Sequence, residues 1–195
     1  MFHARREDSP ERGPVRDFSH LAGEFRPPPS SFADAASGRD QRITLADGKT
    51  ISLKLPPGVD DGTLMRLKGK GHPGPGGNGD GIVTVEIGQH PFFRRDGDHI
   101  RMDLPITLDE ALRGAKVKCP TVDGPVMLTI KPGTNSGTIM RLAGKGWTRK
   151  TATGEPARGD QFVTLEIHLP RDRARLEERL EGWSDTSQVR EKFGL

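Results

Sequence analysis

The residues whose types and spacing most resemble a chemical motif are the glycines of Gly69-Lys70-Gly71-His72-Pro73-Gly74, which fit the pattern GxGxxG. This pattern binds phosphate when it opens a helix, because the first amides of that helix then point at the anion. Here it runs into Pro75-Gly76-Gly77-Asn78-Gly79, which cannot form a helix. We therefore predict a turn that ends a strand, and no phosphate site.

Other side chains that could perform chemistry are scattered along the chain. The six histidines include no pair at i, i+4 and have no cluster of acids beside them, so no metal site is predicted. No serine lies in a nucleophile-elbow sequence. The single cysteine, Cys119, excludes an internal disulfide and a cysteine-cluster zinc site, and its alternating context predicts a core or sheet-face residue. No motif in the sequence indicates an enzymatic activity or a cofactor.

The elements that hold these residues come from an internal repeat. The stretch Pro57–Gly71 returns as Pro132–Gly146, with ten of the fifteen pairs identical. The match continues at a shift of 76 residues before this stretch and of 80 after it, so the second copy has extra residues between Gly146 and Gly159. A repeat of this period predicts two copies of one module, here placed at residues 24–91 and 97–170.

Alternation of apolar and polar residues within each copy predicts strands with one buried face. The clearest runs are 51–55, 83–87, 100–104, 128–130 and 163–169. Asp47-Gly48 and Asp123-Gly124 predict hairpin turns, with Gly62 and Gly137 at further turns that need positive φ. Residues 31–34 and 107–110 read as capping boxes of short helices. The fold class is mainly β: two tandem, sandwich-like modules with one short helix each, followed by a C-terminal amphipathic helix.

The two copies differ at their beginnings. Residues 99–104 alternate well, whereas the counterpart in the first copy runs into Pro27-Pro28-Pro29, which cannot donate hydrogen bonds to a sheet. We expect the first strand of the first module to be an edge strand or to be missing.

The segment that joins the copies is His90-Pro91-Phe92-Phe93-Arg94-Arg95-Asp96-Gly97-Asp98. Adjacent side chains of a strand point to opposite faces, so Phe92 and Phe93 cannot both face one core. We expect one ring to pack at the interface of the modules and the other to be left for a groove. The alternative is that the rings plug a hinge, at 92–98, that holds the modules at a fixed angle.

The two ends of the chain differ from the modules. Residues 1–23 are rich in charged residues, glycine and proline, which predicts a disordered arm and no signal peptide. Within 171–195, Leu176, Leu180 and Trp183 lie at helical spacing on one face, which either packs on the second module or pairs with another chain. No apolar run reaches the roughly 20 residues of a membrane span. We expect a cytoplasmic protein that has no membrane association.

The net charge of +3 and the pI of about 9.2 are mildly basic. Both signs of charge are mixed, as on an ordinary solvated surface. The chain has no tyrosine and few aromatic residues, so stacking platforms for nucleic-acid bases are not expected.

Several motifs together resemble the C-terminal half of DnaJ-type co-chaperones, over residues 30–170. They are the repeated Pro-Gly-x-x-x-Gly-Thr, the Arg-Leu-x-Gly-Lys-Gly turns, the junction 90–98, and Leu104-Pro105-Ile106 leading into Asp109-Glu110-Ala111-Leu112-Arg113-Gly114. The resemblance implies two β-rich domains, of which the first binds non-native polypeptide, the client, in a shallow apolar groove. It also implies dimerisation through the far C-terminus and transfer of the client to a DnaK-type ATPase chaperone.

The resemblance places the groove along the strand Arg42-Ile43-Thr44-Leu45, with Ile43 and Leu45 on one face and Phe93 closing it. Phe92 then belongs to the module interface. The C-terminal residues expected in dimerisation or packing are Leu176, Leu180 and Trp183. A trough flanked by unpaired strand amides accepts an extended segment by β-addition. In relatives the opposite wall is a strand that Pro27 to Pro29 replace here.

Two parts of the family pattern do not occur in this sequence. The His-Pro-Asp loop of the J domain is absent, so we expect that this chain alone does not stimulate a DnaK-type ATPase. The cysteine-rich zinc module is also absent, which makes the zinc-less subclass, with its curved-DNA-binding members, the most similar. One alternative is therefore a nucleic-acid-associated protein, favoured by the pI and by Arg171, Arg173 and Arg175. Another is a truncated remnant that dimerises with full-length relatives.

Overall fold

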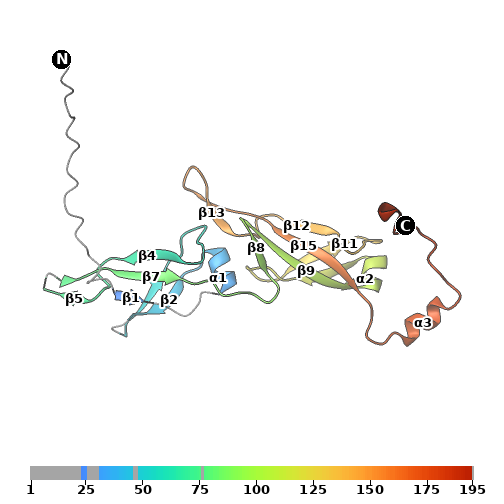
Figure 1. Cartoon of the computed structure of the whole chain (residues 1–195), viewed down its shortest axis with the longest axis horizontal. Helices are drawn as coiled ribbons and strands as arrows, with labels where there is room; N and C mark the ends of the chain where they lie inside the picture. Colours follow the sequence, from blue (N-terminus) through green and yellow to red (C-terminus); the bar gives the residue numbers. More distant parts are fainter. Residues whose placement is uncertain (1–22, 26–30, 46–47, 76, 195) are drawn as a thin grey trace, which may run out of the picture. The chain divides into compact units, whose positions relative to one another are not determined.

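The computed structural model describes residues 23–25, 31–45, 48–75 and 77–194 (Figure 1). The chain divides into two compact units that meet between Gln89 and His90, and each contains one copy of the repeat. We call the first unit module one and the second module two. The expected arm at 1–23, except Gly23, and the segment Pro27 to Pro29 lie outside the described residues.

Module one is built on a three-stranded sheet in the order β1-β7-β4, in which β1 is parallel to β7 and β4 is antiparallel to it. Two antiparallel hairpins, β2–β3 and β5–β6, accompany this sheet. Its elements are β1 (Gly23–Phe25), α1 (Phe32–Ser37), β2 (Gln41–Thr44), β3 (Thr50–Leu53), β4 (Thr63–Leu67), β5 (Pro73–Gly74), β6 (Gly77–Asn78) and β7 (Gly81–Val85).

The core of module one lies between the β2–β3 hairpin and the sheet. Its central cluster unites side chains of the hairpin with Val83 of β7, and partly buried residues of β3 and β4 pack against it. The members are Ile43, Leu45, Leu53 and Val83, with Ile51, Met65 and Leu67 around them. The hairpin therefore forms a second layer, which makes the module a small sandwich. Among the described strands, β1 lies at the sheet edge, as predicted for the first strand of module one.

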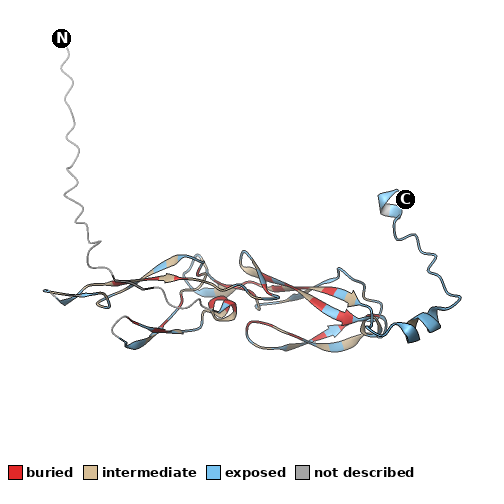
Figure 2. Ribbon diagram, turned by 60° about the horizontal axis from the view of Figure 1, so that its bottom comes forward, coloured by how far each residue is buried: buried red, intermediate tan, exposed pale blue. Residues whose placement is uncertain are grey.

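Module two is built on a larger sheet, in the order β12-β15-β9-β8, with β9 parallel to β15 over eight residue pairs. The hairpins β10–β11 and β13–β14 are antiparallel. Its elements are β8 (Arg94–Asp96), β9 (His99–Thr107), α2 (Leu108–Arg113), β10 (Ala115–Cys119), β11 (Val126–Ile130), β12 (Ile139–Leu142), β13 (Thr148–Lys150), β14 (Pro156–Arg158) and β15 (Gln161–His168), followed by α3 (Ala174–Leu180) and the 3-10 turn η1 (Glu191–Phe193). Figure 2 shows the buried residues gathered along the strands of this module.

The strands and turns expected from alternation are confirmed in both modules. The runs at 51–55, 83–87, 100–104, 128–130 and 163–169 coincide with β3, β7, β9, β11 and β15 within a few residues. The expected hairpin glycines, Gly48 and Gly124, have positive φ and lie at the β2–β3 and β10–β11 turns.

The expected hinge at 92–98 is not a free connection, because its residues 94–96 form β8. This strand pairs with β9 through a tight turn at Gly97, whose φ of 59° favours glycine. The segment therefore contributes the outer strand of the module two sheet.

The short helices begin as their sequences predict. Thr107 accepts from the backbone of Glu110, and the Glu110 carboxylate accepts in return from the Thr107 amide, which completes a capping box for α2. In α1, Ser31 accepts from the Asp34 amide, but its hydroxyl donates to the Asp34 carboxylate. The cap of α1 is therefore only half of a reciprocal box.

The C-terminal helix α3 is shorter than the expected apolar stripe. It ends at Leu180, so Trp183 lies beyond it and cannot share its face, because Gly182 at positive φ turns the chain in between. No residue of α3 is buried, and Leu180 and Trp183 are exposed. Among the described helices, none has both the length and the apolar composition that a membrane span requires.

Candidate functional site

The glycine-rich motif forms a backbone staple in each module. The Asp80 carboxylate accepts from the Gly69 amide at 2.7 Å and from the Arg66 guanidinium at 2.6 Å. The amide of Gly69 and then the Arg66 side chain hold the pKa of Asp80 below its ordinary value. In module two, the Asp160 carboxylate accepts from the Gly144 amide at 2.9 Å and pairs with Arg141. The turn is thus filled by a side chain of the protein, and the prediction that no helix follows it is confirmed.

The residues expected to bind client through their side chains lie in or near the cores. Ile43 is 3% exposed and Leu45 is 7% exposed, and both belong to the central cluster of module one. Phe93 is buried at 5%, whereas its neighbour Phe92 is 42% exposed. The structure therefore gives Phe92 the accessible ring. A serine at position 43 or 45 would damage the core, so it could not separate binding from folding.

His90 organises the two phenylalanines. Its Nδ1 accepts from the amides of Phe92 and Phe93 at 3.4 Å and 3.3 Å, and its ring lies 4.3 Å and 4.5 Å from theirs. Burial lowers the pKa of His90 below its ordinary value, which favours the neutral ring that Nδ1 needs to accept. The junction is therefore a compact turn built around one imidazole.

The main chain of β2 offers a different kind of site. The Leu45 amide donates to the Lys49 carbonyl at 2.9 Å, so the main-chain groups of Leu45 face β3. Because these directions alternate along a strand, the amides and carbonyls of Arg42 and Thr44 point away from β3. Within the part of the chain that the structure describes, β2 pairs with β3 alone. The β2 edge, meaning these outward groups of Arg42 and Thr44, has the geometry that accepts an added strand.

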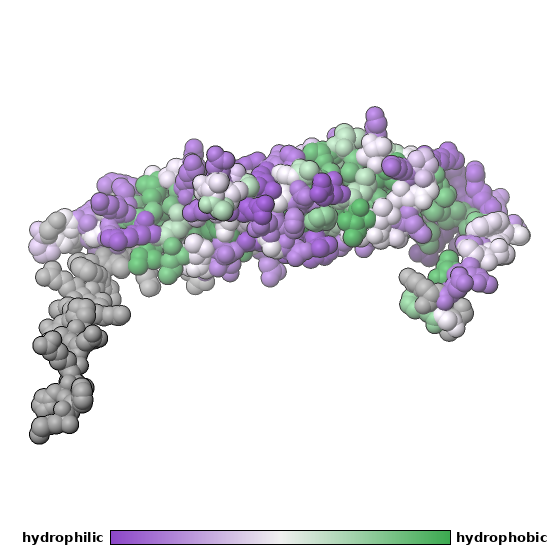
Figure 3. All heavy atoms as spheres, turned by 90° about the horizontal axis from the view of Figure 1, so that it is seen from above, coloured by the Kyte–Doolittle hydropathy of each residue, from purple (hydrophilic) through white to green (hydrophobic). Residues whose placement is uncertain are grey.

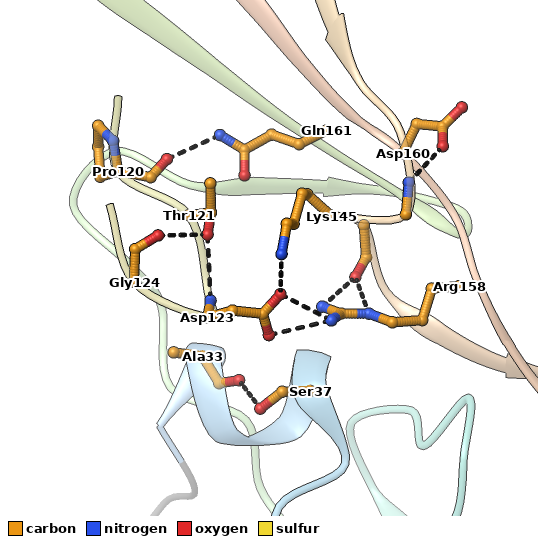
Figure 4. A network of polar contacts seen from close by, with 12 residues as sticks. Ala33, Ser37, Pro120, Thr121, Asp123, Gly124, Lys145, Arg158, Asp160 and Gln161 are labelled. Atoms are coloured by element: carbon orange, nitrogen blue, oxygen red, sulfur yellow. Dashed lines mark hydrogen bonds and ion pairs between the residues drawn. The ribbon is translucent and has the colours of Figure 1, made fainter. Parts of the chain in front are cut away.

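A network of charged groups stabilises module two next to its β10–β11 turn (Figure 4). Both carboxylate oxygens of Asp123 accept from Arg158, at 3.0 Å and 2.8 Å, and one accepts from Lys145 at 3.1 Å. Burial alone would raise the pKa of Asp123, but the hydrogen bonds from Arg158 and Lys145 outweigh it and lower the pKa. Because one carboxylate binds two cations from different segments of module two, this cluster is a structural clamp.

The described residues contain neither a cluster of metal ligands nor an ionised thiol. No group of three or more His, Cys, Asp or Glu side chains among them lies close enough together to hold a metal ion. Cys119 is fully buried, and burial raises the pKa of its thiol to about 11, so it stays protonated at neutral pH.

The exposed apolar side chains are spread over both modules and the C-terminal segment. On the face in Figure 3, hydrophobic residues occupy separate areas among hydrophilic ones. The larger ones include Leu64, Leu112, Met127, Ile139, Leu169, Val189 and Phe193.

Comparison with known proteins agrees with the fold and with the repeat. Residues 29–170 match the family model described as the DnaJ C terminal domain. The chain is similar to "Chaperone protein DnaJ 1" of Streptomyces avermitilis, at 44% identity over 127 residues, which cover 64% of this chain and 31% of that protein. It is also similar to "Chaperone protein DnaJ" of Bacillus cytotoxicus, at 44% identity over 63% of this chain and 33% of that protein.

A longer alignment is found with "Chaperone protein DnaJ" of Ruminiclostridium cellulolyticum. The identity is 37% over 151 residues, which cover 71% of this chain and 39% of that protein. The chain thus spans about a third of the length of the curated relatives it matches.

Proposed function

Because the chain belongs to the DnaJ C-terminal domain family, we propose that it acts as a chaperone that binds extended segments of non-native polypeptide along the β2 edge of module one. The observation that carries this proposal is the outward direction of the amides and carbonyls of Arg42 and Thr44. The relatives it matches are named chaperones.

Strand addition suits a client that has no fixed structure. An unfolded segment exposes its own amides and carbonyls, and pairing with a free edge satisfies them without regard to sequence. Alternate client side chains would point toward the layer that holds Ile43 and Leu45, where apolar residues are favoured. This arrangement gives affinity through the main chain and only weak selectivity through side chains.

The proposed role is binding and not catalysis. A DnaK-type ATPase chaperone is a proposed partner that receives the client. Homodimerisation through the C-terminal segment, with Leu176, Leu180 and Trp183, is a further proposal.

The alternative of nucleic-acid binding is not favoured by the charges on the modules, because arginines on both modules pair with aspartates. Such pairs are Arg66–Asp80, Arg94–Asp103, Arg101–Asp96, Arg141–Asp160, Arg149–Asp98 and Arg158–Asp123.

The test is a binding titration with a matched pair of peptides. A fluorescent, apolar, extended peptide is titrated with the whole chain, and the control peptide has the same sequence with alternate amides N-methylated. We expect saturable binding of the first peptide and a loss of at least about tenfold in affinity for the second, because N-methylation removes the donors that pair with a strand edge.

A second readout is the aggregation of a chemically denatured protein after dilution, followed by light scattering. The chain should suppress scattering at near-stoichiometric ratios, and the unlabelled peptide should reverse this effect by competition. Equal affinity for both peptides would exclude strand addition, and absence of binding and of suppression would refute the client-binding role itself.

A further inference from the structure

The two modules differ at the position where the β2 edge would have its counterpart. In module one the Gly48 amide donates to the Leu45 carbonyl, and in module two the Gly124 amide donates to the Thr121 carbonyl. Leu45 and Thr121 therefore occupy the same place in their hairpins. The residue before each of them is Thr44 in module one and Pro120 in module two.

At Pro120 the outward donor is missing, and an internal hydrogen bond occupies the outward acceptor. Proline has no amide hydrogen, so no donor is available there. Its carbonyl accepts from the side-chain amide of Gln161 at 2.9 Å, as Figure 4 shows. Gln161 is fully buried, and its nitrogen also lies 3.3 Å from the Met102 sulfur. At the counterpart of Thr44, the donor is thus missing and the acceptor is satisfied within module two. The counterpart of Arg42 is Lys118, whose main-chain groups point outward as those of Arg42 do.

Module one lacks both of these features. Sheet register places Gly81 opposite Leu67 in β4, as it places Gln161 opposite Leu142 in β12, so Gly81 is the counterpart of Gln161. Glycine has no side chain that could reach the Thr44 carbonyl. A Cβ at Gly81 would lie 3.2 Å from the Lys70 carbonyl oxygen, a close approach that a small shift could relieve.

We propose that Pro120 and Gln161 close module two against strand addition, so that the chain has a single client site, and that Thr44 and Gly81 keep the corresponding edge of module one open. This inference rests on the proposed client binding and adds the residues that select the module. A client at module two would have to displace Gln161 from a buried hydrogen bond and would gain no donor at Pro120. We expect that combination to weaken binding there by about tenfold to a hundredfold.

The first test transfers the module two residue into module one. Thr44→Pro removes the outward amide, and Thr44→Val is the matched control, because it keeps the amide and a β-branched side chain. The fluorescent peptide should bind the proline variant at least about tenfold more weakly and the valine variant within about twofold of the parent. Thermal unfolding of each variant verifies that module one stays folded.

A second closing variant covers the case in which Thr44→Pro does not fold. Gly81→Gln introduces the side chain that module two uses, and it should also weaken peptide binding about tenfold or more. Glutamine is accommodated at the matching place in module two, so the fold has a precedent for it.

The opposite test opens module two. In Pro120→Thr with Gln161→Gly, both residues are exchanged for those of module one, and calorimetric titration should change from one bound peptide per chain to two. Pro120→Thr alone restores only the donor, so it serves as a milder variant with a weaker second site.

The outcomes separate this inference from the proposed function. A parent chain that binds no peptide contradicts the function. A parent chain that binds two peptides, or a folded Thr44→Pro variant that binds like the parent, contradicts the inference and leaves the function standing. A folded double variant that still binds one peptide also overturns it.

Discussion

Modules one and two share one arrangement of elements, and they differ in how much of their strand edges and cores is paired or buried. Both contain the Arg–Asp–Gly staple, a short capped helix and a two-stranded hairpin. Module two contains β8, pairs β9 with β15 over eight residues and buries Trp147, whereas the described part of β1 in module one pairs over three residues. The repeated residues therefore maintain the scaffold, and the residues that differ decide which edge stays available.

The largest difference to test is the packing of Trp147. This side chain is fully buried, with the Arg95 guanidinium 4.2 Å above its ring, and its counterpart His72 is exposed. Trp147→Ala should lower the unfolding free energy of module two by about 3–5 kcal/mol through lost burial and a cavity. Urea unfolding followed by circular dichroism measures it. His72→Ala, the matched change in module one, should cost less than about 0.5 kcal/mol, and an equal cost would show that the packing of the modules is alike.

The next effect should be shared by both modules. A Cβ at Gly71 would overlap the Asp80 carbonyl oxygen, and a Cβ at Gly146 would overlap the backbone of Gly159 and Asp160. Each contact is with backbone, which cannot move aside, so Gly71→Ala and Gly146→Ala should each cost about 1–3 kcal/mol. Differential scanning calorimetry should show a lower unfolding temperature for both variants. An unchanged unfolding temperature for either variant would show that the turn of that module tolerates a side chain.

A smaller effect concerns the clamp at Asp123, which the described part of module one does not contain. The pKa of Asp123 is lowered, so the native state favours the carboxylate and its contribution is present above about pH 3.8. This contribution is lost as the pH falls below 3.8 toward the native pKa. Because the carboxylate is partly accessible to water, we expect about 1 kcal/mol or less. Asp123→Asn should therefore reduce the difference in unfolding free energy between pH 6 and pH 3, measured by urea unfolding. If this difference is the same in the variant and the parent, the Asp123 cluster does not stabilise module two.

The smallest effect concerns His90 at the beginning of module two. Its pKa is lowered, so the unfolded chain binds the proton more readily and stability should fall as the pH drops below about 6.5. Protonation also removes the Nδ1 acceptor of the Phe92 and Phe93 amides. The midpoint of urea unfolding should decrease slightly between pH 7.5 and pH 5.5, and His90→Asn should lose this dependence. If the parent's midpoint does not change over this range, the turn does not depend on the neutral ring.

Much of the fold was predictable because its determinants are close together in the sequence. Alternation over five to seven residues specifies β3, β9 and β15, and a hydroxyl three residues before an acid specifies the start of α2. The sequence predicted β4 only as the strand that ends at the Gly69–Gly74 turn, and alternation assigned no bounds to β4 or β12, although they form the best-repeated motif. Their side chains are only half-buried on the inner face, so the hydrophobic signal is weak.

The candidate site was predictable only in part. The segment Arg42–Leu45 was identified as its strand, but Ile43 and Leu45 were interpreted as contact residues and lie in the core instead. An apolar residue in an alternating run looks the same whether it faces a core or a groove. The β2 edge presents main-chain amides and carbonyls, which all residues except proline carry alike, so the residue types do not reveal that this edge is accessible.

The sequence by itself determined the two modules, their strands and their capped helices, because repeats, periodicity and caps act over short distances along the chain. Tertiary structure alone decided which edge is open. Pro120 and Gln161 are 41 positions apart, and their hydrogen bond exists only because β15 and the end of β10 are brought together. Neither residue forms a pattern on its own, so the closing of one module and the opening of the other became visible only in three dimensions.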